Sequence, residues 1–233
     1  MNIDVVITSM NEPQLDRCLQ SVRNQTYPFY RIINIHGVSP FYVAYNRAVS
    51  SVETDWFVFI GGDMILYERG LERVIRFMEK YPSDKCCGYY ITLYDPFLEI
   101  KTGYLGLQRT ATFKKQLATD DHNFDRNMMT RLRQEGWFIR KSMGEIAGTH
   151  FENPDEFQVF HRFFTLATRD GEWGYEVNRN IVVKLYEKHK DSLHTLALDA
   201  LDFGKDRHYP KSIDINHNHT MYEEFKQWRE NRP

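Results

Sequence analysis

A single carboxylate near the middle of the chain precedes a stretch with helical spacing. Asp125 stands six residues before Arg131, and the apolar residues that follow Asp125 recur as on one face of a helix. A carboxylate at the start of a helix accepts backbone N–H bonds, and the helix dipole favours its charged form. Asp125 is therefore a candidate general base, although the same position also suits an ordinary N-cap. Asp120 and Asp121 compete for the role of base.

A second candidate for chemistry is a carboxylate that follows an apolar run. Asp63 comes directly after Gly61 and Gly62 at the end of such a run, and His150 lies much later in the chain. Oxygen ligands suit Mg²⁺ or Mn²⁺, and an added imidazole favours Mn²⁺. Asp63 is thus a candidate metal ligand, with His150 as a second ligand. The alternatives are a strand-ending turn for the aspartate and a structural role for the histidine.

The elements that must position these residues alternate between strands and helices. Apolar, β-branched runs predict strands, and helical stripes lie between them, which indicates βαβ units and a mainly parallel sheet flanked by helices. Ligands of such α/β sheets bind beyond the carboxyl ends of the strands. The polar residues at those ends should therefore share one cleft. The predicted strands span residues 5–8, 31–35, 55–60 and 86–93.

From about residue 155 the pattern becomes helical. Phenylalanines at 157, 160, 163 and 164 form a stripe that predicts core packing, and further helical stretches follow near 181–189, 192–201 and 222–229. The expected organisation is one α/β domain over residues 1–154. A helical extension packed on that domain would cover residues 155–233.

Composition limits the classes of partner. Among the 233 residues, 30 are Lys or Arg and 32 are Asp or Glu, so no basic field indicates a nucleic-acid partner. Cys18, Cys86 and Cys87 lack disulfide or zinc spacing, which is typical of reduced thiols. Neither a signal sequence nor an 18-residue apolar stretch is present, so no transmembrane segment is expected and the predicted location is cytoplasmic.

Several short motifs, taken in order, resemble family 2 glycosyltransferases, which are nucleotide-sugar-dependent enzymes of the GT-A fold. The resemblance covers roughly residues 3 to 150, and it rests on the order and spacing of the motifs together. The matching segments are Val5–Pro13 with its continuation to Pro28, Ala44–Ala48, Phe57–Asp63, the Asp125–Gly136 segment, and His150.

The resemblance implies an α/β fold of the GT-A, Rossmann-like type and a sugar transfer from a UDP- or GDP-sugar to the hydroxyl of a glycan or other acceptor. In the inverting reaction it implies, Asp125 deprotonates the acceptor hydroxyl. Asp63, with His150, would hold Mn²⁺ or Mg²⁺ at the diphosphate, where the cation neutralises the charge of the leaving group. The implied nucleotide-sugar contacts are Thr8, Ser9, Asn11, His36, Asn46, Gly62, Asp63, Gly103, Tyr104 and Arg109.

The sequence also departs from the family pattern. Gly61 replaces the first Asp of the Asp-x-Asp motif, Ile35 and His36 replace an acidic pair, and Phe124 replaces a Glu. One alternative is therefore a non-catalytic nucleotide- or glycan-binding protein that keeps the fold. A nucleotidyltransferase is a further alternative, but residues 8–13 lack the glycine and basic residue of a triphosphate-binding loop.

Overall fold

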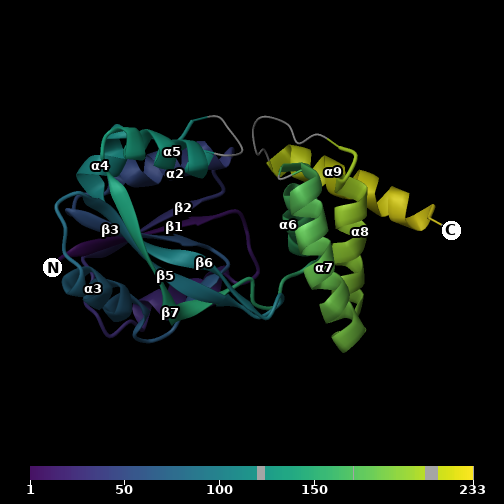
Figure 1. The fold of residues 1–233 in the computed structure, drawn as a ribbon, viewed down its shortest axis with the longest axis horizontal. Coiled ribbons are helices and arrows are strands. Elements are labelled where there is room, and N and C mark those ends of the chain that lie inside the picture. The colour runs from purple at the N-terminus through teal and green to yellow at the C-terminus, as the bar shows by residue number, and fades with distance from the viewer. Residues whose placement is uncertain (120–123, 170, 208–214, 233) are drawn as a thin grey trace. The chain divides into compact units, whose positions relative to one another are not determined.

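The computed structural model describes residues 1–119, 124–169, 171–207 and 215–232. It divides into two compact units, residues 1–153 and residues 154–233. Figure 1 shows a sheet with helices on both faces in the first unit and helices alone in the described part of the second.

Three strands that the sequence predicted lie side by side and run parallel in one half of the sheet. The strand β1 is buried along its whole length, as expected of an apolar central strand with neighbours on both sides. It pairs in parallel with β2 and with β3. These strands and the two helices that connect them are β1 (Ile3–Ser9), α1 (Leu15–Arg23), β2 (Arg31–His36), α2 (Phe41–Ser51) and β3 (Trp56–Gly61).

The helix α1 begins at Leu15, with Gln14 in the N-cap position. Asn11 has a left-handed backbone, with φ of 72°, which asparagine tolerates better than most residues. It belongs to the turn that leaves β1 rather than to the helix.

The other half of the sheet is mixed. β6 runs antiparallel to β3 and β5, β7 runs parallel to β5, and β4 runs antiparallel to β7. The resulting order is β2-β1-β3-β6-β5-β7-β4. The strands are β4 (Met64–Leu66), β5 (Cys86–Asp95), β6 (Ile100–Arg109) and β7 (Phe138–His150).

Gly103 and Gly106 lie within β6. The glycines in this region serve packing. A Cβ at Gly106 would lie 2.5 Å from the Tyr90 ring, and a Cβ at Gly88 would lie 2.6 Å from it. The ring therefore occupies the space that two missing side chains leave.

Each face of the sheet has its own apolar core. Side chains of α1 and α3 cover one face, where Leu71 and Val74 are fully buried, and side chains of α2, α4 and α5 cover the other. Figure 1 shows α2 and α5 together on the side of the sheet opposite α3. These further helices are α3 (Gly70–Lys80), α4 (Thr110–Lys115) and α5 (Phe124–Gln134).

The second unit is built around aromatic side chains. The Phe160 ring lies 5.2 Å from that of Phe164 and 4.7 Å from that of Phe225, and all three are buried. The phenylalanine stripe therefore packs in a core, as predicted. The helices are α6 (Glu156–Arg169), α7 (Gly171–His189), α8 (Ser192–Gly204) and α9 (Ile215–Glu230). Among the described residues, no helix is both long and apolar enough to cross a bilayer.

Candidate functional site

The carboxyl ends of β1, β2 and β3 lie side by side. Ser9 is in register with His36, and Thr8 is in register with Gly61. The N–H of Gly62 donates to the Thr8 carbonyl at 2.9 Å, which carries the β3 ladder one residue past the strand. This is the edge at which ligands of parallel α/β sheets bind.

The two polar side chains at the β1–β2 end are joined. Ser9 Oγ and His36 Nδ1 lie 2.9 Å apart, and the N–H of Gly37 donates to the Ser9 carbonyl at 2.9 Å. Ser9 is buried whereas His36 is exposed, so the buried hydroxyl orients an imidazole ring that reaches solvent. An imidazole held in this way can stack on a base or bond a ribose hydroxyl.

The side chains of Asp63 and His150 lie against each other although 86 residues separate them in the sequence. His150 Nε2 lies 3.1 Å from Asp63 Oδ2, and each side chain keeps about a quarter of its surface open. Pairing of β4 with β7 places them, because Met64 is in register with His150. The buried amide of Gln14 then donates to the carbonyls of Glu152 and Asn153 at 3.0 Å each, which anchors the chain directly after His150.

Two buried polar atoms at this edge have no hydrogen-bond partner among the described residues. They are Oγ1 of Thr8 and Nδ1 of His150. A Cβ at Gly103 would lie 3.7 Å from that histidine nitrogen, so the glycine borders the same space. An unsatisfied buried polar group costs about 1–3 kcal/mol, which a ligand that bonds to it would recover.

Glu12 is a site residue that the sequence analysis missed. Its Oε2 accepts the N–H of Met10 at 2.7 Å, and a Cβ at Gly62 would lie 2.7 Å from the same oxygen. Burial raises the pKa of Glu12, and the nearby charge of Asp63 raises it further. The sequence feature that could have indicated it is the position of this acidic residue just beyond the end of the first strand. Glycine at 62 is what allows this carboxyl group to approach β3.

Cys18 lies beneath the same edge as a neutral thiol. Its Sγ donates to the Gly61 carbonyl at 3.6 Å. Burial, followed by the charges of Asp63 and Glu12, raises the pKa of Cys18 to about 12. A thiol with this pKa is not deprotonated near neutral pH, so Cys18 serves packing rather than nucleophilic or metal chemistry.

Arg109 does not belong to this edge, which corrects its assignment to the donor site. It pairs with Trp56 at the amino end of β3, because β6 runs antiparallel to β3. Its guanidinium lies 4.6 Å from the centroid of the Trp56 ring, and its Nε donates to the Cys86 carbonyl at 3.3 Å. A sequence motif gives no strand direction, so the motif alone could not reveal this.

Tyr104 and Asn46 lie on the sheet face that α2 and α5 cover. The Tyr104 ring packs edge-on against Tyr90, and the ammonium of Lys141 lies 4.3 Å from its centroid. The Asn46 amide donates to the Ala118 carbonyl and accepts from the Ala118 N–H, both at 2.8 Å. Asn46 therefore fixes the segment after α4, and donor contact by either residue stays a prediction.

The candidate base lies in the first turn of a helix, as expected. Asp125 is the second residue of α5, so it stands inside the helix rather than at its N-cap. Its side chain is outside the described part of the structure, and Asp120 and Asp121 lie outside the described residues. Arg131 in the same helix donates to Gln116 Oε1 at 2.9 Å and to the Leu117 carbonyl at 2.6 Å. These bonds tie α5 to the segment that Asn46 holds.

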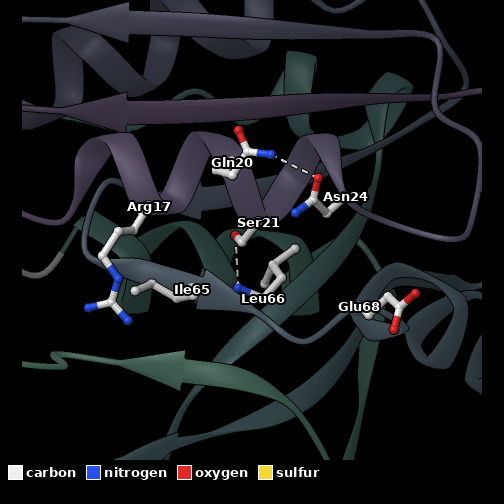
Figure 2. Close-up of a pocket in the computed structure, with 7 residues that line it drawn as sticks. All are labelled: Arg17, Gln20, Ser21, Asn24, Ile65, Leu66 and Glu68. Atoms are coloured by element: carbon white, nitrogen blue, oxygen red, sulfur yellow. Dashed lines mark hydrogen bonds between the residues drawn. The ribbon is translucent and has the colours of Figure 1, made fainter.

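A groove of about 660 Å³ lies between α1 and β4 in the first unit (Figure 2). None of the residues predicted to bind donor or metal lines it. Two hydrogen bonds join residues of its lining, from Gln20 to Asn24 and from the Leu66 N–H to Ser21 Oγ. The chemistry-bearing side chains lie instead on the open strand-end edge. The groove is lined by Arg17, Gln20, Ser21, Asn24, Ile65, Leu66 and Glu68.

Asp63 and His150 together fit a divalent cation. Their facing atoms are 3.1 Å apart. Two ligands about 2.1 Å from one ion and at right angles to each other are separated by about 3 Å. Within the described ranges no third His, Cys, Asp or Glu completes a cluster. A cation held here would take its remaining ligands from substrate oxygens and water, as Mg²⁺ and Mn²⁺ commonly do.

Comparison with known proteins gives similarity of structure only. No protein-family model and no curated protein sequence matches the chain. It is similar to S. aureus TarS 1–349 in complex with UDP, at 15% identity and a TM-score of 0.53, over 85% of this chain and 71% of that one. Full-length TarS gives 15% identity and a TM-score of 0.52, but the match covers 43% of its length and 86% of this chain.

A second similar structure is the mannosyltransferase PcManGT from Pyrobaculum calidifontis in complex with GDP-Man and Mn²⁺. It is 11% identical with a TM-score of 0.53, over 97% of this chain and 82% of that one. At such identities the likeness establishes the fold. The chain has a mixed α/β sheet flanked by helices, as these structures do, which confirms the fold class predicted from sequence.

Proposed function

We propose that this protein is a glycosyltransferase that moves a sugar from a nucleotide-diphosphate donor to an acceptor hydroxyl. One observation carries the proposal. The Asp63–His150 pair lies just past the carboxyl end of β3, where Gly61 is in register with Thr8 of β1. Structures of similar fold contain UDP in one case and GDP-Man with Mn²⁺ in another. A UDP- or GDP-sugar is the donor class that follows.

The donor would lie across the strand-end edge. His36, whose Nδ1 lies 2.9 Å from Ser9 Oγ, would contact the nucleoside, and the Thr8 hydroxyl, which has no partner among the described residues, would be a further contact. Asp63 and His150 would hold Mn²⁺ or Mg²⁺ at the diphosphate. Such a cation supplies charge neutralisation as the bond to the nucleotide breaks.

Asp125 is the proposed general base. It lies in the first turn of α5, where the helix dipole favours a carboxylate. A carboxylate placed there receives the proton of the acceptor hydroxyl as that oxygen attacks the anomeric carbon from the face opposite the leaving group. This role requires an inverting reaction. The acceptor is a glycan or another molecule that carries a hydroxyl group.

Donor binding is the first test. Isothermal titration with UDP, GDP and their sugars, with and without Mn²⁺, should show one nucleotide bound more tightly when the metal is present. Asp63→Asn removes the charge at the cation and should weaken metal-dependent binding by about tenfold or more. Asp55→Asn makes the same change at the amino end of β3 and should leave binding unchanged. Equal metal-dependent affinity in Asp63→Asn and the wild type would refute the site.

Transfer is the second test, and it separates an enzyme from the alternative of a non-catalytic binding protein. General-base assistance is typically worth about 10²–10⁴-fold, so Asp125→Asn should lose roughly that much turnover while donor affinity stays the same. Wild-type turnover in Asp125→Asn would assign the base to another residue, with Asp120 and Asp121 the next to substitute. Donor binding without any transfer or donor hydrolysis by the wild type would favour the binding protein.

A further inference from the structure

The amino end of the sheet, opposite the strand-end site, carries a band of aromatic and basic side chains. Register places its members together, because Trp56 pairs with Arg109 and Cys86 pairs with Phe138 across adjacent strands. We call this band the amino-end rim. It consists of Trp56, Lys80, Tyr81, Lys85, Arg109, Trp137, Phe138 and Arg140, all in the first unit.

The cations of the amino-end rim are stacked on rings instead of being neutralised. Lys80 and Arg140 lie 5.3 and 5.8 Å from the centroid of the Tyr81 ring. Lys85 and Arg109 lie 5.6 and 5.9 Å from that of Trp137. None of these four cations forms an ion pair with any residue in the described ranges. Their positive charge is therefore available to an anionic partner.

Two rings at this end are exposed well beyond what packing requires. Tyr81 keeps 41% of its surface in water and Phe138 keeps 37%. The two rings are close together, because the Arg140 guanidinium lies 5.8 Å from the centroid of Tyr81 and 5.3 Å from that of Phe138. Single exposed rings are common on protein surfaces, but exposed rings that gather mark interaction sites.

We propose that the amino-end rim docks this protein on an anionic phospholipid surface. Tyr, Trp and Phe rings settle at the headgroup level of a bilayer, and Lys and Arg beside them are attracted to anionic lipids. Charge complementarity supports this occupant, since the four cations of the rim form no ion pair with a described residue and outnumber the exposed carboxylates that adjoin them in sequence, which are Asp55, Glu79 and Asp84. Docking at this end leaves the edge that carries Asp63 and His150 facing away from the lipid.

Vesicle co-sedimentation of the whole protein tests the proposal. The probes are vesicles of phosphatidylcholine alone and of phosphatidylcholine mixed with phosphatidylglycerol. Binding should appear with the anionic vesicles and fall with added salt, because attraction to headgroups is screened within a Debye length. Each cation removed should lower partitioning about fivefold, so Lys85→Gln should partition about fivefold less than the wild type. The double variant Lys80→Gln/Lys85→Gln should partition about 25-fold less.

Two further variants keep the test specific. Lys101→Gln removes an exposed cation at the opposite end of β6, and it should partition like the wild type. Tyr81→Ser/Phe138→Ser keeps the charges and removes the exposed rings, and it should also lose binding to anionic vesicles. Circular dichroism confirms that each variant is folded.

Three results would overturn the proposal. Equal binding to neutral and anionic vesicles, or none to either, removes the role of charge. An equal loss in Lys101→Gln and Lys85→Gln indicates a dependence on net charge rather than on this surface. Unchanged vesicle binding in Tyr81→Ser/Phe138→Ser, with loss only on charge removal, indicates adsorption to any polyanion, which soluble heparin would then reproduce.

Discussion

At the scale of single residues, the strand-end site concentrates negative charge where water is limited. Glu12 is held against Gly62 by the N–H of Met10, and the charge of Asp63 opposes its ionisation. Two carboxyl groups that repel each other are a natural place for a cation or a bound proton. The pKa of Glu12 is therefore a direct report on the electrostatics of the site.

The raised pKa of Glu12 predicts how stability depends on pH. Below the ordinary glutamate value of 4.5, both the folded and the unfolded protein carry the proton and the residue contributes nothing. Above that value the unfolded protein loses the proton first, so the free energy of unfolding falls with rising pH. The fall ends once the pH exceeds the raised value. One proton gives a slope of at most about 1.4 kcal/mol per pH unit.

Glu12→Gln should remove this fall while its amide oxygen still accepts the N–H of Met10. Urea unfolding over a series of pH values should therefore show the variant matching the wild type at low pH and exceeding it at higher pH, without metal or nucleotide. Glu145→Gln makes the same change at an exposed position and is the reference. A variant no more stable than the wild type near neutral pH would contradict the burial argument.

At the scale of elements, strands could be predicted from sequence where a short stretch of the chain determines both the strand and its direction. The first three strands are apolar runs separated by helices, and a helical crossover returns the chain to the same end of the sheet, so these strands run parallel. Their carboxyl ends, with Thr8, His36 and Gly61, therefore met as the pattern indicated. Asp63 lies just past the end of β3 for the same reason.

The antiparallel strands could not be placed in the same way. β6 and β7 pair with strands whose partners are set by long-range register, and no short pattern encodes the direction of that pairing. Arg109 was therefore assigned to the wrong end of the sheet, and no local pattern indicated the hydrogen bonds between Asn46 and Ala118. Glu12 was missed because its burial depends on the close approach of Gly62.

The contacts among helices show how the site is supported from a distance. Asn46 on α2 holds Ala118, and Arg131 on α5 bonds to Gln116 and Leu117 in the same segment. One short stretch thus couples the two helices that cover this face of the sheet. These hydrogen bonds, together with the apolar contacts of Met128 and Leu132, hold α5, which carries the backbone of Asp125.

At the scale of the whole molecule, the chain consists of two units with separate cores. The apolar side chains of residues 1–153 pack on both faces of the sheet, and the rings of residues 154–233 pack among their own helices. In the second unit, Arg229 and Arg232 bond to Asp199 and Asp202, which ties α9 to α8. Each unit therefore holds most of its stabilising contacts within itself.

This separation predicts that residues 1–153 fold without the rest. The fragment keeps the complete sheet, both of its cores, the Asp63–His150 pair and the Ser9–His36 bond. A chain of about 150 residues buries enough apolar surface to be stable as a single domain. The fragment should therefore unfold cooperatively in urea, with a circular dichroism spectrum that contains both strand and helix.

The same fragment also tests where the proposed donor binds. Every residue proposed here for donor and metal contact lies before residue 154, so the affinity for nucleotide with Mn²⁺ should match that of the whole chain within about threefold, or roughly 0.7 kcal/mol. Calorimetry on both proteins makes the comparison, and Asp63→Asn in the fragment shows that the same site is measured. A folded fragment with no nucleotide affinity would mean that residues 154–233 contribute to the donor site. An unfolded fragment would mean that the helical unit is part of the folding domain.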